Sequence, residues 1–271
     1  MAALQLLPGP WGGAPVKSIV YGIVDANRAE ETELPPGLRG AELDQVRHGD
    51  LAALLSPLPD GAGEAAGIEQ ALAYARIVER LHHELTIVPM RYGCFVTRKE
   101  QVEEFLRRNE DEFLKALASI EGCDEVGVRL LLPRTETREE GTAGAAAEAG
   151  ADSAPGAGYL SARRRYYDQQ AEAEAICRGW AERVQAVFGG MFRQSSWEYI
   201  VRPEGMLLSL SFLVEKPRVA AFQRAFHEFR RAHAVGAICS GPWPPYVLVA
   251  GLAQPDVAAQ AELQFLQRKK G

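Results

Sequence analysis

The chain has 271 residues, of which 47% are hydrophobic and 24% charged, a composition typical of a globular protein with well-packed cores. Its formal net charge of -6 argues against binding to nucleic acid or anionic lipid through bulk charge. The cysteines Cys94, Cys123, Cys177 and Cys239 include no C-x-x-C pair, so we expect neither a zinc site nor a disulfide scaffold, and a reducing cytoplasm fits.

The N-terminal domain is predicted over residues 16–133 and alternates strand-like with helical patterns. The expected elements are a strand at 16–24, a hairpin turning at 48–49, a helix at 68–84, a strand at 86–92, a helix between 97 and 122, and a strand at 126–132. The first of these helices carries Ile68, Leu72, Ala75, Val78 and Leu81 or His82 at helical spacing, which predicts a buried stripe along these residues. Pro89 places its strand at a sheet edge or a bulge, because proline cannot donate a ladder hydrogen bond. This order predicts an α+β domain.

A flexible linker is predicted at residues 134–158, which are rich in alanine, glycine and acids and contain no large apolar side chain. The C-terminal domain follows at 159–251, with a polar tail at 252–271. Its expected elements are a helix at 159–188, a hairpin turning at 202–205, a helix that begins at Pro217 and buries Phe222, and a strand region at 237–251. The α-β-β-α-β order predicts a modified ferredoxin-like sandwich whose first strand is missing or supplied from elsewhere.

Motifs for chemistry are weak throughout the chain. The G-x-G-x-x-x-G spacing of Gly61, Gly63 and Gly67 departs from the dinucleotide fingerprint, so a flexible loop is the better interpretation. Adjacent His82 and His83 point about 100° apart on a helix and do not suit one metal ion. We therefore predict no catalytic, cofactor-binding or metal-binding residues.

Two further candidates also favour a structural interpretation. Ser240 lacks the glycine spacing of a nucleophile elbow, and Pro242 removes a backbone donor that an oxyanion hole would use. Residues 163–165 are three arginines followed by two tyrosines, which indicates a possible nucleic-acid patch. Three consecutive residues fan around more than half of a helix, however, so a solvated face or a salt bridge to the acidic partner domain is favoured.

Four stretches stand out together: V-Y-G-I at 20–23, V-P-M-R-Y-G at 88–93, Y-L followed by two arginines at 159–164, and S-G-P-W-P-P-Y at 240–246. In order and spacing they resemble the gas vesicle protein F/L family (GvpF/GvpL), over about residues 16–251, and the last stretch is the most specific. The departures are small: Cys94 stands where the family usually has a small polar residue, Tyr92 replaces phenylalanine, and Val247-Leu248 stand where Ser-Phe is frequent.

The resemblance implies a non-enzymatic accessory protein of gas vesicle formation that requires no cofactor. It implies a minor vesicle component or assembly factor that binds the hydrophobic major shell protein, prevents its aggregation during nucleation and works with other accessory proteins. The expected location is the gas vesicle, with a cytoplasmic stage before assembly. The family fold is likewise an α+β N-terminal domain with a modified ferredoxin-like C-terminal domain.

The candidate partner-binding residues are Trp243 and Tyr246, with Arg91 and Tyr92 as a second pair. Prolines around aromatic residues mark an irregular sheet edge, where apolar side chains reach a partner. The alternative is that Trp243 plugs the core beneath the helix that carries Phe222, and its exposure distinguishes the two. Two other functions stay open: a small-ligand sensor or enzyme, which requires a pocket with convergent polar groups, and a nucleic-acid binder.

Overall fold

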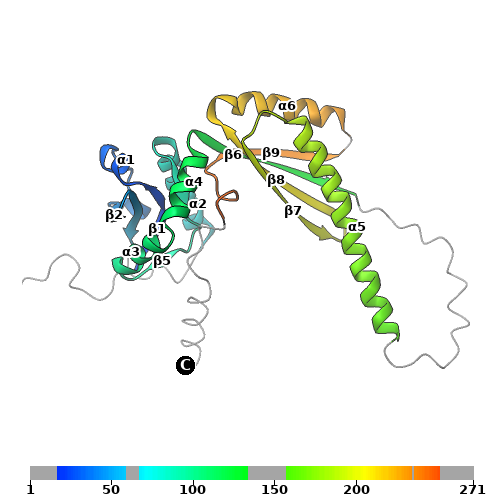
Figure 1. The fold of residues 1–271 in the computed structure, drawn as a ribbon, viewed down its shortest axis with the longest axis horizontal. Coiled ribbons are helices and arrows are strands. Elements are labelled where there is room, and N and C mark those ends of the chain that lie inside the picture. The colour runs from blue at the N-terminus through cyan, green and yellow to red at the C-terminus, as the bar shows by residue number, and fades with distance from the viewer. Residues whose placement is uncertain (1–16, 59–66, 134–156, 234, 251–271) are drawn as a thin grey trace, which may run out of the picture. The chain divides into compact units, whose positions relative to one another are not determined.

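The computed structural model describes residues 17–58, 67–133, 157–233 and 235–250 (Figure 1). The chain divides into two compact units: unit 1 is residues 1–125 with 242–271, and unit 2 is residues 126–241. This division differs from the boundary drawn at 134–158 on the sequence. Residues 134–156 of that predicted linker, Gly61 and Gly63 of the predicted loop, and the tail at 252–271 lie outside the described residues.

Unit 1 is built on an antiparallel sheet with the strand order β2-β3-β1-β4, and β5 also pairs with β1. Its elements are β1 (Ser18–Asp25), α1 (Ala26–Glu31), η1 (Leu38–Gly40), β2 (Asp44–His48), β3 (Leu51–Pro57), α2 (Ile68–Glu84), β4 (Ile87–Pro89), β5 (Phe95–Val96), α3 (Lys99–Arg108) and α4 (Glu110–Ile120). The predicted hairpin is present between β2 and β3, where Gly49 takes a φ of +54°. Pro89 ends the edge strand β4, as its missing donor requires.

Helix α2 has the predicted bounds, and the C-terminal part of its predicted buried stripe is confirmed. Its buried residues are Tyr74, Ile77, Val78, Leu81 and His82, whereas Ile68 is 81% exposed and Leu72 is 53% exposed. Nearer the N-terminus Tyr74 is buried instead, and its hydroxyl lies 2.9 Å from the carbonyl oxygen of Val20 and 2.8 Å from that of Met90. The predicted stripe was therefore right at Val78 and Leu81 and wrong at Ile68 and Leu72.

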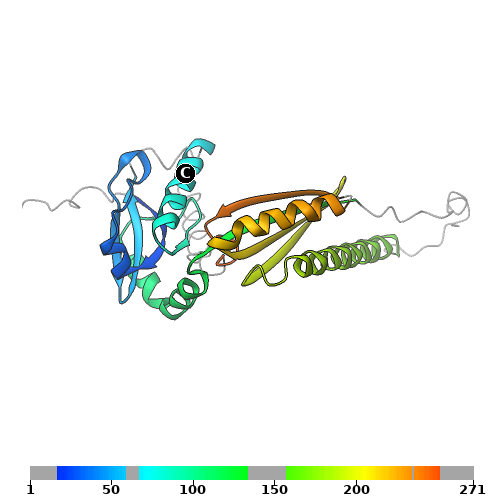
Figure 2. The ribbon, with the colours of Figure 1, turned by 90° about the horizontal axis from the view of Figure 1, so that it is seen from above.

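Unit 2 is a four-stranded sheet with the order β7-β8-β6-β9, and α5 and α6 cover one of its faces (Figures 1 and 2). Its elements are β6 (Cys123–Leu132, shared with unit 1), α5 (Ala157–Val187), β7 (Gln194–Arg202), β8 (Gly205–Glu215), η2 (Lys216–Arg218), α6 (Val219–Ala232) and β9 (Gly236–Trp243, which also ends in unit 1). Strand β6, which the sequence analysis assigned to the N-terminal domain, belongs to this sheet. It pairs between β8 and β9.

The core of unit 2 is aromatic. Phe188 stacks on Phe222 with ring centroids 4.3 Å apart, and Phe212 lies 5.2 Å from Phe222. Alternate residues of each strand join this cluster, as expected for strands with one face turned to the helices. Trp180 and Trp197 pack against the cluster and are natural reporters of its integrity.

We expect Phe222→Ala to lower the free energy of unfolding of unit 2 by about 3–5 kcal/mol, because a fully buried ring in contact with two others would leave a cavity. Urea unfolding followed by tryptophan fluorescence measures the change. Ile68→Ala is the control: this side chain is already 81% exposed, and a surface truncation costs at most about 0.5 kcal/mol. Equal midpoints for the two variants would contradict the assignment of the core.

Candidate partner-binding surface

The segment that starts with the last two residues of β9 presents one aromatic side chain to solvent. We call residues 242–250, all within unit 1, the return segment. Trp243 is 44% exposed and Val247 is 46% exposed, whereas Pro244, Pro245 and Val249 are buried. Trp243 is therefore not the core plug that the sequence left as an alternative.

A buried carboxylate holds the return segment in place. The Glu125 side chain, 6% exposed, accepts a hydrogen bond of 2.8 Å from the Val247 backbone N–H and a longer one of 3.4 Å from Leu248. The segment also closes on itself, because the Tyr246 N–H donates to the Pro244 carbonyl at 2.8 Å. Hydrogen bonds that involve a charged group are among the stronger ones, so Glu125 fixes the backbone just past Trp243.

Tyrosines connect the return segment to the core of unit 1. Tyr246 and Tyr92 both pack against the cluster that contains Tyr74, whose ring lies 5.4 Å from that of Tyr92 and stacks on Tyr21 at 5.2 Å. The Tyr92 hydroxyl donates to Gln70 Oε1 at 3.0 Å. Burial, and then the nearby Glu79 carboxylate, raises the pKa of Tyr246, which stays a neutral phenol at physiological pH.

The four candidate residues are paired differently from the sequence prediction, which grouped Trp243 with Tyr246 and Arg91 with Tyr92. Tyr92 and Tyr246 meet at Tyr74 and serve as internal supports, whereas Trp243 and Arg91 are exposed. Sequence reasoning missed Glu125, the carboxylate that anchors the segment. An acid directly before the apolar alternation of β6 was the available signal, because a charged residue that is drawn into the strand needs a partner.

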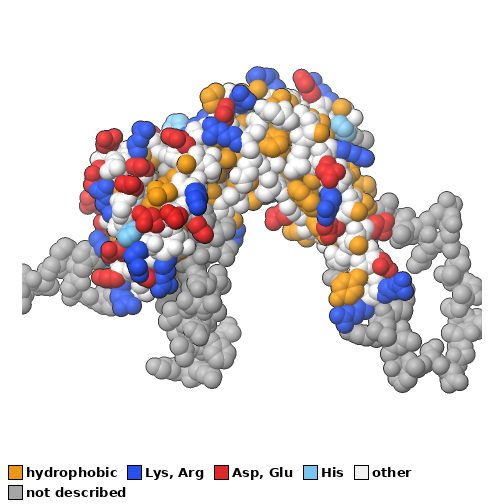
Figure 3. All heavy atoms as spheres, viewed as in Figure 1, with side chains coloured by type: hydrophobic (Ala, Val, Ile, Leu, Met, Phe, Trp, Pro, Cys, Tyr) orange, Lys and Arg blue, Asp and Glu red, His pale blue; other side chains and the backbone are white. Residues whose placement is uncertain are grey.

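Side chains suited to metal binding do not cluster in the part of the chain that the structure describes. That part holds no cluster of three histidine, cysteine or carboxylate side chains suited to a metal ion. His82 Nε2 instead lies 2.8 Å from Asp124 Oδ1, an ion-pair geometry within unit 1. Basic and acidic side chains also intermix over the visible face of unit 1, rather than forming a region of one sign that would attract nucleic acid (Figure 3).

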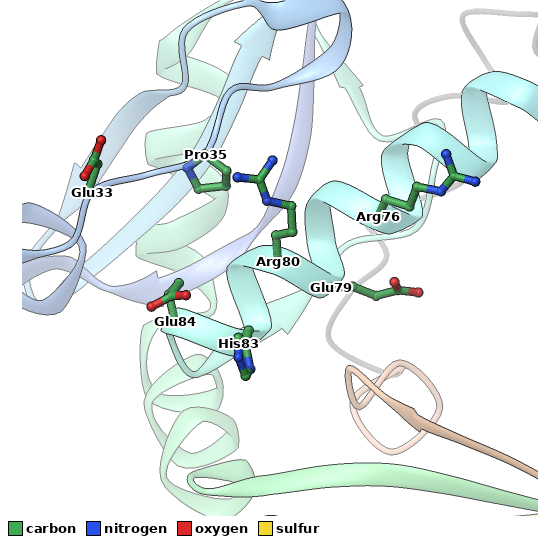
Figure 4. A pocket seen from close by; sticks show the side chains of 7 residues that line it. All are labelled: Glu33, Pro35, Arg76, Glu79, Arg80, His83 and Glu84. Atoms are coloured by element: carbon green, nitrogen blue, oxygen red, sulfur yellow. The ribbon is translucent and has the colours of Figure 1, made fainter.

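One pocket of unit 1 lies along α2 and has a volume of about 570 Å³ (Figure 4). It is lined by Glu33, Pro35, Arg76, Glu79, Arg80, His83 and Glu84. Five of these seven come from one helix, and Figure 4 shows their side chains pointing in different directions rather than toward a common point. This is not the convergent polar site that a ligand sensor or enzyme requires.

Comparison with solved structures defines the class of protein. The fold is similar to the crystal structure of the gas vesicle protein GvpF from Microcystis aeruginosa, with a TM-score of 0.65 and 12% identity over 89% of this chain and 100% of that one. It is also similar to GvpF from Anabaena sp. PCC7120, with a TM-score of 0.59 and 14% identity over 89% and 97% of the two chains. The class is thus a mixed helix-and-sheet protein with the fold of the gas vesicle proteins F.

Sequence comparison identifies the family. The family model for gas vesicle synthesis protein GvpL/GvpF matches residues 18–249, so the chain belongs to this family and takes part in gas vesicle formation. Gas vesicle protein L of Streptomyces sp. (strain CB03234) is 26% identical over 242 residues, which cover 82% of this chain and 88% of that protein. Among the helices that the structure describes, none combines the length and apolar character needed to cross a membrane.

We expect Glu125→Ala to loosen the return segment, because the Val247 N–H loses a buried acceptor at a cost of about 1–3 kcal/mol. Hydrogen–deuterium exchange of the peptide over 242–250 should accelerate. Glu125→Gln keeps one acceptor oxygen and should have a smaller effect. Unchanged exchange in Glu125→Ala would show that the carboxylate does not hold the segment.

The Cys94 thiol is expected to be unreactive at neutral pH. Burial raises its pKa from 9.0 to about 11, and only the thiolate is nucleophilic. Alkylation by iodoacetamide at pH 8 should therefore be about a hundredfold slower than for a thiol of pKa 9, since each unit of pKa above the pH lowers the thiolate fraction about tenfold. The rate should rise toward pH 11, and mass spectrometry after digestion follows it. Fast labelling at pH 8 would reveal an activated thiol.

Proposed function

We propose that this protein is a non-enzymatic accessory factor that binds the hydrophobic major shell protein of the gas vesicle and prevents its aggregation during nucleation. Membership of the GvpL/GvpF family supports a place in vesicle formation, and the exposed indole of Trp243 is the single structural observation that carries the binding role. An exposed aromatic ring on a rigid backbone suits a contact with an apolar partner, because little conformational entropy is lost on binding.

The docking surface in this proposal centres on Trp243 and Val247, with Arg91 at the same unit's surface and with Tyr92 and Tyr246 as supports. Trp243 and Val247 are both about half exposed and belong to one short segment that the Glu125 carboxylate anchors. The two buried prolines between them restrict the backbone further. The surface therefore needs little reorganisation to bind.

We further propose that unit 2 is a modified ferredoxin-like sandwich and that its first strand is β6. The chain order β6-α5-β7-β8-α6-β9 and the sheet order β7-β8-β6-β9 support this assignment. The domains proposed on the sequence then shift: the C-terminal domain takes in β6, and the linker at 134–158 joins β6 to α5 inside it. The protein acts first in the cytoplasm and then at the vesicle, together with other accessory proteins.

Trp243→Ala should weaken capture of the major shell protein by about tenfold or more and reduce its solubility on co-expression, because truncation of a central aromatic anchor costs about 2 kcal/mol. A pull-down with the shell protein measures the first effect, and the soluble fraction of shell protein measures the second. Trp243→Phe should retain part of the binding, since it keeps an apolar ring.

Ile68→Ala is the matched control for this experiment, because it removes an even more exposed apolar side chain from α2 in the same unit. It should bind like the wild type. Unfolding curves establish that both variants are folded. A folded Trp243→Ala protein that captures the shell protein normally would refute the docking role, whereas deletion of the gene tests the broader function by the loss of vesicles.

A further inference from the structure

Unit 2 has a sheet face that neither α5 nor α6 covers (Figures 1 and 2). Successive residues of a strand point to opposite faces, so the neighbours of residues in the helix-side core lie on the other side. Leu130, Leu208, Tyr199 and Cys239 belong to that core or pack against it. On this basis the residues facing away from the helices include Arg129 and Leu131 on β6, Leu207 on β8, Glu198 and Ile200 on β7, and Ile238 on β9. Leu213 on β8 has the same orientation but is only 1% exposed, so the face is covered at that end of β8. We call the first six of these residues the open face.

The open face carries an aliphatic side chain on each of its four strands. Ile200 is 51%, Leu131 50% and Ile238 66% exposed, and Leu207 is partly buried. Ile200 and Leu207 are paired directly in the sheet register. Across the sheet, a Cβ built on Gly236 would lie 3.5 Å from that of Leu131, which places Leu131 beside β9 two residues from Ile238. Exposed aliphatic side chains gathered on one face indicate an interface.

Short side chains surround the four aliphatic residues on this side of the sheet. Ser209 and Ser211 alternate with the core residues of β8, and Ser196 is paired with Ser211 on β7. On β9, Ser240 approaches Gly127 so closely that a Cβ on that glycine would lie 2.8 Å from its Oγ. Two sheets stack about 10 Å apart when short side chains interdigitate, so this face suits another sheet.

The charges of the open face identify the occupant as a second copy of the chain. The face carries the exposed guanidinium of Arg129 on β6 and the exposed carboxylate of Glu198 on β7. A twofold axis turns the same surface against itself, so that the acid of one copy can meet the base of the other. A face with one charge of each sign beside an apolar row therefore complements itself.

We propose that the protein forms a twofold-symmetric dimer through the open face, with the four aliphatic residues at its centre and Arg129 of each copy paired with Glu198 of the other. This dimer does not depend on the proposed binding of shell protein, because its readout is the mass of the purified full chain.

Ile238→Arg tests the apolar part of the interface. The variant places two arginines in the apolar centre of each dimer. We expect each arginine to raise the dissociation constant about tenfold, which gives about a hundredfold in total. Sedimentation equilibrium of the full chain over a range of concentrations measures it. Ile68→Arg makes the same change at a more exposed isoleucine of unit 1 and should leave the dimer intact.

Charge reversal tests the symmetry. Arg129→Glu gives a face with two acids, and Glu198→Arg gives one with two bases, so each variant alone should be a monomer where the wild type is a dimer. An equimolar mixture of the two should form a heterodimer, because both contacts are then restored. The double variant should dimerise with itself.

Three outcomes would overturn the proposal. The first is a wild-type chain that stays monomeric at all concentrations, as it would if a segment of its own covered the face. The second is a dimer that survives Ile238→Arg and dissociates in Ile68→Arg, which would move the interface to α2. The third is a pair of charge-reversed variants that fail to combine when mixed although both are folded by circular dichroism.

Discussion

The hydrogen bond from the Val247 N–H to the buried Glu125 carboxylate decides where the return segment lies, and with it the exposure of Trp243. A carboxylate at 6% exposure is costly to bury unless donors replace its water. Two consecutive backbone N–H groups provide such donors here, and Pro244 and Pro245 pack inward just before them. With the backbone held at residue 247, the Trp243 side chain is left at the surface rather than in the cluster around Tyr74.

Features set by local chemistry were predictable from the sequence. The bounds of α2 and the turn at Gly49 follow from apolar spacing and from turn residues within a few positions of each other. The burial of Tyr74 in place of Ile68 and Leu72 was not predictable in this way, because the Tyr74 hydroxyl bonds to the carbonyl of Val20, 54 residues away in the chain. Periodicity identified the helix and the burial of Val78 and Leu81, but a hydrogen bond distant in sequence favours the burial of Tyr74.

The sheet that a strand joins is likewise not predictable from local sequence. The apolar alternation of β6 predicts a strand, and nothing within 123–132 says which sheet that strand joins. Its assignment depends on pairing with β8 and β9, which are separated from it by the whole of α5 and more. The same limit applies to the return segment. The sequence singled out Trp243 and Tyr246, yet the ring of Trp243 is exposed and that of Tyr246 packs on the unit 1 core. This difference depends on residues that are distant in the chain.

The two proposed surfaces are compatible with each other. Trp243 belongs to the return segment of unit 1, whereas the open face belongs to unit 2. The two proposed interfaces therefore use different residues. A dimer would carry two return segments. Two linked contacts exceed either alone in apparent affinity whenever their geometry allows simultaneous binding. A single exposed indole of modest intrinsic affinity would then suffice to retain shell subunits, because the second copy raises the local concentration of binding sites.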